Sequence, residues 1–171
     1  KKAKTFIYDY KEVQNYEIFG QDKFAYSYIN DEFYGEINFD PQLISVVGLD
    51  IETKTVSDDG KKGFPDIAKA SHPITAITMK KFGGPTYMFG LKDYRPKDKT
   101  VTYFKCTDEA SLLAAFIELW DGEEMTPDIL TGWNIEFFDI PYLVNRITKI
   151  LGPSMAKMLS PWRILEEYEV T

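Results

Sequence analysis

The sequence predicts an α/β fold in which a mixed β-sheet is flanked by helices and preceded by a small α+β appendage. Residues 44–53 form an apolar run, which is typical of a central strand. Residues 108–120 repeat apolar side chains at the spacing of an amphipathic helix, and a further strand and helix follow. With 171 residues, of which 44% are hydrophobic and 15% aromatic, the chain is long enough to bury one core.

The appendage comprises residues 1–43. A helix is predicted over residues 9–20, because Asp9 is a suitable N-cap and Gly20 can end the helix. Two aromatic-rich stretches that are typical of strands follow, separated by a turn at Asn30 and Asp31: residues 24–29 and 33–39. The appendage therefore combines a helix with a predicted hairpin.

The main sheet is predicted to begin with residues 44–53. Their apolar side chains cover both faces, so this strand is expected to be buried on each side. Later strands are separated by glycine-rich, proline-rich or charged turns, which favours an antiparallel meander. These strands are residues 74–79, 87–91 and 101–106, and a short strand over residues 128–131 comes after the first helix.

Two helices are predicted to cover the sheet. Thr107 or Asp108 caps the first, and the second begins near Asp139 with Pro141 in its first turn. Several strands followed by helix, strand and helix indicate the ribonuclease H-like plan. A fold of this kind does not by itself assign an activity, so the function must be inferred from the site residues.

Composition limits the possible functions. The net charge of −7 and the pI near 4.8 argue against a self-sufficient nucleic-acid binder, since lysine and arginine supply most phosphate affinity. The single cysteine, Cys106, cannot form an internal disulfide, which fits a reducing compartment. No apolar stretch approaches the length of a membrane helix, so we expect a soluble, cytoplasmic protein without a membrane partner.

An acidic pair closes the predicted central strand. Asp50 and Glu52 are two residues apart, so their side chains share one face of the strand at a spacing of about 6.5 to 7 Å. Neighbouring like charges are costly to bury unless a cation or hydrogen bonds compensate them, and carboxylate oxygens suit Mg²⁺ or Mn²⁺. The alternative is a strand end that simply emerges into solvent.

A third carboxylate comes from the start of the second helix. Asp139 is a possible N-cap, which is the simpler interpretation of this residue alone. Helical spacing also aligns Asp139 with Leu143 and Ile147, the stripe expected to pack on the sheet. The carboxylate would then point toward Asp50 and Glu52, and three converging acids indicate a two-metal nuclease site.

These motifs resemble a known family. Asp50-Ile51-Glu52 and the segment from Asn134 to Asp139 are similar to the first two exonuclease motifs of the 3′–5′ proofreading domain of family B DNA polymerases. Within that family, residues 130–134 and 138–142 are most similar to the replicative polymerases of T-even-type bacteriophages. The resemblance covers roughly residues 24–165, and both motifs occur in the family's order.

The resemblance implies that Asp50, Glu52 and Asp139 are catalytic ligands of two divalent ions, Mg²⁺ or Mn²⁺, that remove a mispaired 3′ nucleotide. It also implies that Phe64 inserts among the bases of the single-stranded 3′ end and that Asn134 helps to place this strand. The alternatives are a loop phenylalanine that covers the core and a turn-forming asparagine. Phe137 departs from the family, which usually has a small polar residue at this position.

The resemblance further implies that residues 1–43 are part of the polymerase N-terminal domain and that residues 44–171 are an exonuclease domain that is incomplete at its C-terminus. The family's third motif, a tyrosine with an aspartate four residues later, would lie beyond residue 171. We therefore expect little activity from this chain alone. The expected partners are the remaining polymerase domains or a complementing polymerase fragment, in the host cytoplasm if the protein is viral.

Two other functions remain possible from the sequence. The fold could serve as a non-catalytic scaffold or single-strand-binding piece of a split polymerase. It could also belong to a free-standing exonuclease of the same acidic superfamily, which would need its own fourth carboxylate. Nucleotide release from a mismatched primer distinguishes an enzyme from a scaffold.

Overall fold

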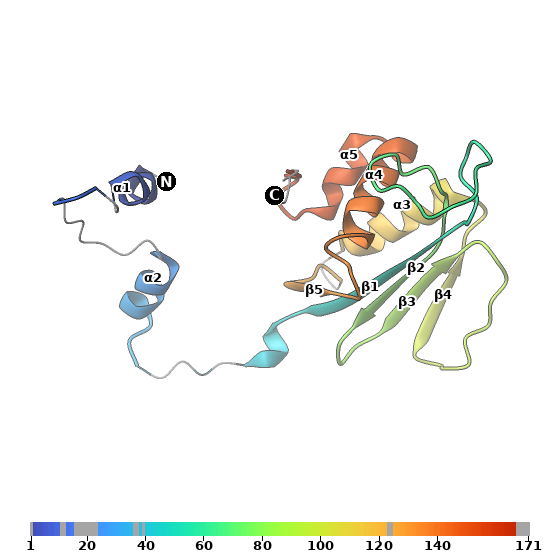
Figure 1. The fold of residues 1–171 in the computed structure, drawn as a ribbon. Coiled ribbons are helices and arrows are strands. Elements are labelled where there is room, and N and C mark those ends of the chain that lie inside the picture. Colours follow the sequence, from blue (N-terminus) through green and yellow to red (C-terminus); the bar gives the residue numbers. More distant parts are fainter. Residues whose placement is uncertain are drawn as a thin grey trace. The chain divides into compact units, whose positions relative to one another are not determined.

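A computed structural model describes residues 2–10, 13–15, 24–35, 38, 40–122 and 125–166 of the chain. The chain divides into two compact units, Lys1–Pro41 and Gln42–Thr171, and the boundary falls within a short 3-10 helix, η1 (Pro41–Leu43). Figure 1 shows the elements of both units. The second unit contains all the strands among the described residues.

The first unit contains two helices, α1 (Lys2–Tyr10) and α2 (Phe24–Glu32). The rings of Phe6 and Tyr10, four residues apart on α1, lie 4.8 Å from each other. The predicted helix over 9–20 is wrong in position: α1 ends at Tyr10 and a turn occupies residues 14–15, while residues 11–12 and 16–20 lie outside the described residues.

The predicted hairpin of the appendage is also wrong. Residues 24–29 belong to α2, which also contains the expected turn residues Asn30 and Asp31, and the described part of 33–39 forms no strand. The alternation of aromatic residues suggested a strand, but a strand needs a partner for its backbone groups. A helix satisfies those groups within its own segment, so it forms where no partner strand is available.

The described residues of the second unit form a five-stranded sheet in the order β4-β3-β2-β1-β5. Strand β1 pairs antiparallel with β2 and parallel with β5, as expected of a ribonuclease H-like sheet. The predicted strands are confirmed, and no strand end lies more than two residues from its predicted position. Their bounds are β1 (Val46–Thr53), β2 (Ile74–Lys81), β3 (Thr86–Gly90), β4 (Val101–Lys105) and β5 (Ile129–Thr131).

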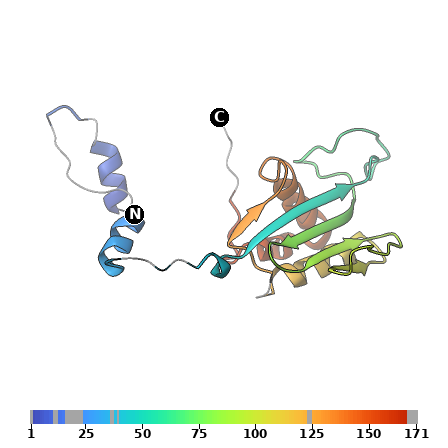
Figure 2. The same ribbon diagram turned by 90° about the horizontal axis from the view of Figure 1, so that it is seen from below.

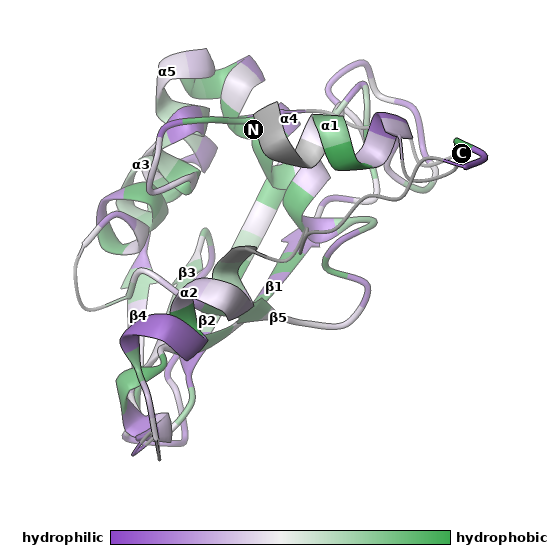
Figure 3. Ribbon diagram, turned by 90° about the vertical axis from the view of Figure 1, so that its left-hand side faces the viewer, coloured by the Kyte–Doolittle hydropathy of each residue, from purple (hydrophilic) through white to green (hydrophobic). Residues whose placement is uncertain are grey.

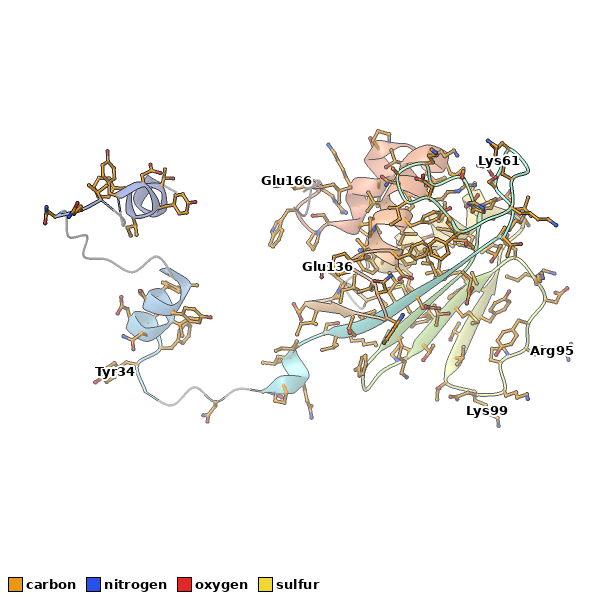
Figure 4. All side chains as sticks on the ribbon, in the orientation of Figure 1. Tyr34, Lys61, Arg95, Lys99, Glu136 and Glu166 are labelled. Atoms are coloured by element: carbon orange, nitrogen blue, oxygen red, sulfur yellow. The ribbon has the colours of Figure 1, made fainter. Side chains whose placement is uncertain are left out.

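The predicted meander is correct for β1, β2 and β3 but wrong for β4, which runs parallel to β3. The connection over residues 91–100 carries the chain back along the sheet, so that Val101 starts beside Thr86 instead of beside Gly90. Arg95 and Lys99 extend outward from this connection in Figure 4. Such a return needs more residues than a tight hairpin, and the charged segment provides them.

Helices α3 (Glu109–Trp120), α4 (Asp139–Leu151) and α5 (Pro153–Ala156), with the 3-10 helix η2 (Lys157–Leu159), cover one face of the sheet. Figure 2 shows the opposite face uncovered by these helices. Asp108 is confirmed as the N-cap of α3, and its side chain accepts the Ser111 N–H in a capping box. None of the described helices is long and apolar enough to cross a membrane.

The burial of β1 alternates along the strand. Val47, Leu49 and Ile51 are buried beneath the helices, whereas Asp50 and Glu52 are exposed on the open face. The prediction that β1 is buried on both faces is therefore wrong for the described residues, because α3 and α4 lie on the same side. Figure 3 shows hydrophobic residues on both the strands and the covering helices, and the core lies between these two layers.

Gly132 directly follows β5, at a point where the chain passes so close to β1 that there is no room for a side chain. A Cβ atom at this position would lie 2.5 Å from the Leu49 carbonyl oxygen. We expect Gly132→Ala to lower the free energy of unfolding by about 1 to 3 kcal/mol, the usual cost of overpacking. Gly48→Ala is the control, since its Cβ would meet no atom closer than 3.7 Å. Equal denaturation midpoints for the two variants would contradict this steric argument.

Candidate active site at the edge of the central strand

The acidic pair lies on the open face of the sheet, near its β1–β5 side. In register, Asp50 is opposite Thr78 and Glu52 is opposite Ala76, so both acids share one face with residues of β2. Neither carboxylate has a hydrogen bond or ion pair with another described residue. Both are thus available to an external ligand.

Hollows in the open face flank the two acids. A cleft of about 370 Å³ lies beside Asp50 and is bordered by Lys80, Phe82 and Trp133. A larger cleft of about 750 Å³ adjoins Glu52. The side chain of Trp133 is 92% exposed at the rim of the first cleft. The acids therefore face accessible space instead of the hydrophobic core.

A tight turn between β5 and α4 brings the third acid to β1. Asn134 adopts a left-handed backbone conformation with φ of 55°, and its carbonyl accepts the N–H groups of Phe137 and Phe138. Asn134 thus forms a turn, the simpler of its two interpretations, and it is also exposed. Glu136 marks this turn in Figure 4. The turn ends at Asp139, the first residue of α4.

Asp139 reaches the strand edge between the two acids. The residue is 5% exposed, and its Oδ1 accepts the backbone N–H of Ile51 at 3.2 Å. This N–H is available because β5 pairs with β1 only as far as Gly48. The N-cap of α4 is Phe138, which makes no side-chain capping bond, so the interpretation of Asp139 as an N-cap is wrong.

The environment of Asp139 disfavours its negative charge. Burial raises the pKa of Asp139, the bond from Ile51 N–H opposes this effect, and the neighbouring charge of Asp50 adds to the rise. Among the described residues no cation forms an ion pair with Asp139. A buried carboxylate beside another acid is an arrangement that a divalent cation would stabilise.

The structure places the three acids around Ile51 but does not close them into a metal cage. Asp50 and Glu52 extend on the open face, while Asp139 approaches the edge of β1 from a helix on the covered face. Within the described ranges, no three acidic, histidine or cysteine side chains are grouped to hold a metal ion. Their carboxylate oxygens are the type of donor that a hard divalent cation prefers.

Phe64 projects from the loop between β1 and β2, residues 54–73, which we call the β1–β2 loop. Phe64 is 83% exposed, so it is not a loop phenylalanine that covers the core. Its ring centroid lies 5.3 Å from that of Phe138, which in turn stacks on Tyr142 at 5.4 Å. A line of aromatic rings thus runs from the exposed loop to the helix that begins with Asp139.

A buried ionic cluster beneath this loop was not predicted from the sequence. Arg146 on α4 is 1% exposed and pairs with Glu109 on α3 at 2.6 Å and with Asp58 on the β1–β2 loop at 2.7 Å. Burial alone would lower the pKa of Arg146, but its bonds to Glu109 and Asp58 outweigh burial and raise it. The sequence did contain one sign of this cluster: position 146 lies beside Leu143 and Ile147 on the apolar stripe of α4.

The strand order, the parallel β1–β5 pair and the acidic residues on and beside β1 indicate a ribonuclease H-like domain of the exonuclease class. Comparison with known families agrees with this class. Residues 19–164 match the family model "DNA polymerase family B, exonuclease domain". The chain therefore belongs to the exonuclease domain family of the family B DNA polymerases. The exonuclease domains of this family are hydrolases that depend on metal ions.

Two phage proteins are similar to the chain over most of its length. It is 36% identical over 173 aligned residues to the DNA-directed DNA polymerase of Escherichia phage RB69, and the alignment covers 86% of the chain. It is 33% identical over 171 aligned residues to the DNA-directed DNA polymerase of Enterobacteria phage T4, with 85% of the chain covered. The chain spans 18% of the length of each relative.

Proposed function

We propose that this chain supplies the 3′–5′ proofreading site of a phage DNA polymerase and that Asp50, Glu52 and Asp139 hold two divalent ions, Mg²⁺ or Mn²⁺, there. The observation that carries this proposal is the bond from Ile51 N–H to Asp139, which brings the helix acid to the residue between the two strand acids. When bound, such ions supply an activated water and neutralise charge on the departing 3′ oxygen.

The chain's own groups have distinct parts in this proposal. Burial and the neighbouring charge of Asp50 raise the pKa of Asp139, and a bound cation would favour its ionised form. Glu52, exposed on the same face as Asp50, accepts a hydrogen bond from the attacking water and orients it. The exposed face of the sheet admits the phosphodiester to both residues.

The proposed substrate is the single-stranded 3′ end of DNA. Phe64 is exposed and backed by Phe138, so its ring can stack on a terminal base of any sequence. Asn134 presents its side chain from the exposed turn just before Asp139 and contacts the same strand. Because the net charge of the chain is −7, its binding to DNA is local and is assisted by other polymerase domains.

We also propose which polymerase domains the two parts of this chain belong to. Residues 1–43 would form part of the polymerase N-terminal domain and residues 44–171 the exonuclease domain, with the remaining polymerase domains or a complementing polymerase fragment as partners. The similarity to two phage polymerases supports this assignment. It also supports DNA replication in the cytoplasm of the host cell as the setting.

A nuclease assay tests the proposed function. The chain is mixed with a complementing C-terminal polymerase fragment, Mg²⁺ and a primer with a 3′ mismatch, and nucleotide release is followed. We expect release that EDTA abolishes and that Asp50→Ala reduces by about 100-fold or more, because a lost metal ligand removes several kcal/mol of transition-state stabilisation.

The control is Asp93→Ala, which removes an exposed carboxylate paired with Lys105 on another loop and should leave release unchanged. A folded complex that binds primer but releases no nucleotide would refute the enzyme and favour a scaffold or single-strand-binding piece. Full activity of Asp50→Ala would refute the assigned site.

A further inference from the structure

Helix α4 holds the β1–β2 loop along one of its faces. The side chains that make these contacts recur at three- and four-residue spacing, so they form one stripe of the helix. The Tyr142 hydroxyl, for example, donates to the His72 carbonyl at 2.6 Å and accepts the His72 N–H at 2.9 Å. Among the described residues, the polar contacts of this stripe are Tyr142 with His72, Asn145 with Ile67, and Arg146 and Lys149 with both Asp58 and Ala70.

Arg146 uses all of its hydrogen-bonding capacity in this contact. Two bonds, at 2.7 and 2.6 Å, go to the carboxylate of Glu109, and two, at 2.7 and 3.2 Å, go to that of Asp58. A fifth reaches the Ala70 carbonyl at 2.8 Å. These bonds match the five N–H donors of a guanidinium group, and both carboxylates are held in the planar fork geometry that arginine favours.

The same helix carries the candidate metal ligand. Asp139 and Arg146 are seven residues apart, which places them about 10 Å apart along the axis of α4. Phe64 lies on the loop that Arg146 binds, and its ring contacts Phe138, the residue before Asp139. Helix α4 therefore sets the distance between the exposed ring of Phe64 and the carboxylate of Asp139.

We propose that Arg146 is a positioning residue for the exonuclease reaction: by joining Asp58 and Ala70 to Glu109, it fixes the loop that presents Phe64 relative to Asp139. This inference rests on the proposed function, in which Phe64 stacks on the DNA. Arg146 itself is buried and touches no substrate. Its contribution is to keep the ring of Phe64 at the position where the terminal base arrives.

The ion pair between Asp58 and Arg146 allows the positioning role of Arg146 to be tested without unfolding the protein. Its side chain is 43% exposed, whereas that of Glu109 is 13% exposed. Removing Asp58 leaves Arg146 bonded to Glu109 and Ala70, so the buried cation keeps a partner. The bond from Arg146 also lowers the pKa of Asp58, so the pair stays ionised at neutral pH.

The test compares Asp58→Ala, Phe64→Ala and the double variant in the full 171-residue chain. The first measurement is hydrogen exchange at the loop amides of Ser57 and Ala70. We expect Asp58→Ala to reduce their protection by about 10-fold, while Ile77 in the sheet stays protected, since the loss is local. Asp93→Ala, which removes a surface ion pair from another loop, should change neither amide.

The second measurement is the affinity for a labelled oligo(dT) at low salt in EDTA, where no cutting occurs. We expect Phe64→Ala and Asp58→Ala each to weaken binding by about 10-fold, within the range known for loss of one base stack. The double variant should bind no more weakly than Phe64→Ala, because both changes remove the same contact. A purely structural role of Asp58 would not produce this non-additivity.

Three results would overturn the positioning role. Unchanged exchange at Ser57 and Ala70 in Asp58→Ala would show that the loop is held without the Arg146 contact. Losses of affinity that add in the double variant would show that Asp58 and Phe64 act independently. If Phe64→Ala binds oligo(dT) like the wild type, the DNA contact of the proposed function is wrong and the positioning role falls with it, whatever the exchange result.

Discussion

Asp139→Asn is expected to abolish nucleotide release while raising the stability of the metal-free chain. The amide keeps an oxygen that can accept the Ile51 N–H, so the bond between α4 and β1 survives. The amide has no negative charge with which to bind a cation. We therefore expect release by the complemented chain to fall by about 1000-fold, equivalent to several kcal/mol of transition-state stabilisation.

The effect of this variant on stability has the opposite sign and depends on pH. The pKa of Asp139 in the folded chain is raised above its ordinary value of 3.8 by burial and by Asp50. The stability gained from the protonated form is fully present below that value and is lost as pH rises through the folded pKa. Asparagine is neutral throughout, so its advantage over the wild type should grow with pH and level off once the pH exceeds the folded pKa of Asp139.

Urea denaturation of both proteins in EDTA between pH 3.5 and 7.5 measures this difference. Asp93→Asn is the control, since its carboxylate is exposed and the variant should follow the wild type across the range. A variant that is less stable than the wild type at pH 7 would mean that Asp139 is needed for folding in its charged form. Retained nucleotide release would exclude Asp139 as a metal ligand.

Arg146→Ala is expected to have the largest effect on stability. It leaves the carboxylates of Asp58 and Glu109 without the cation that binds both of them. Removing one partner of a buried ion pair costs about 3 to 5 kcal/mol, and the charge left desolvated here is that of Glu109, whose side chain is 13% exposed. A loss of this size is a large fraction of the stability of an ordinary domain, so the variant should be partly unfolded at 37 °C.

Circular dichroism during thermal and urea unfolding measures this effect. Arg163→Ala is the matched control: it removes an arginine whose pair with Asp121 is far more exposed, and it should cost less than about 1 kcal/mol. Arg146→Met separates charge from volume, since it keeps much of the bulk of the side chain but leaves Glu109 without its cation, while Asp58 keeps its ion pair with Lys149. Equal stabilities of Arg146→Ala and Arg163→Ala would contradict the buried ionic cluster.

The elements of the second unit could be predicted because their signals are local. The apolar run before Asp50 and the capping residue Asp108 each identify an element from neighbouring residues alone. The direction of β4 could not be predicted in this way, because a charged connection is compatible with either direction. The prediction for the appendage is wrong because the aromatic alternation at 24–29 favours a strand only when a neighbouring strand exists to pair with it.

The acidic residues of the site were also predictable, but their arrangement was not. Asp50 and Glu52 were correctly placed on one face of β1 by the two-residue period of a strand. The bond from Ile51 to Asp139 depends on β5 ending its pairing at Gly48, and no local pattern encodes that. The three acids consequently lie around one residue without forming a metal cage among the described residues.

The sequence by itself determined the chemistry of this protein: which residues carry carboxylates, which strand and helix present them, and which family they resemble. Only the tertiary structure decided that Arg146 joins Asp58 to Glu109, and that one helix both begins with Asp139 and holds the loop of Phe64. Periodicity is a property of adjacent residues and can be read along the chain. Partners that are 37 and 88 positions apart meet only after the helices have packed on the sheet.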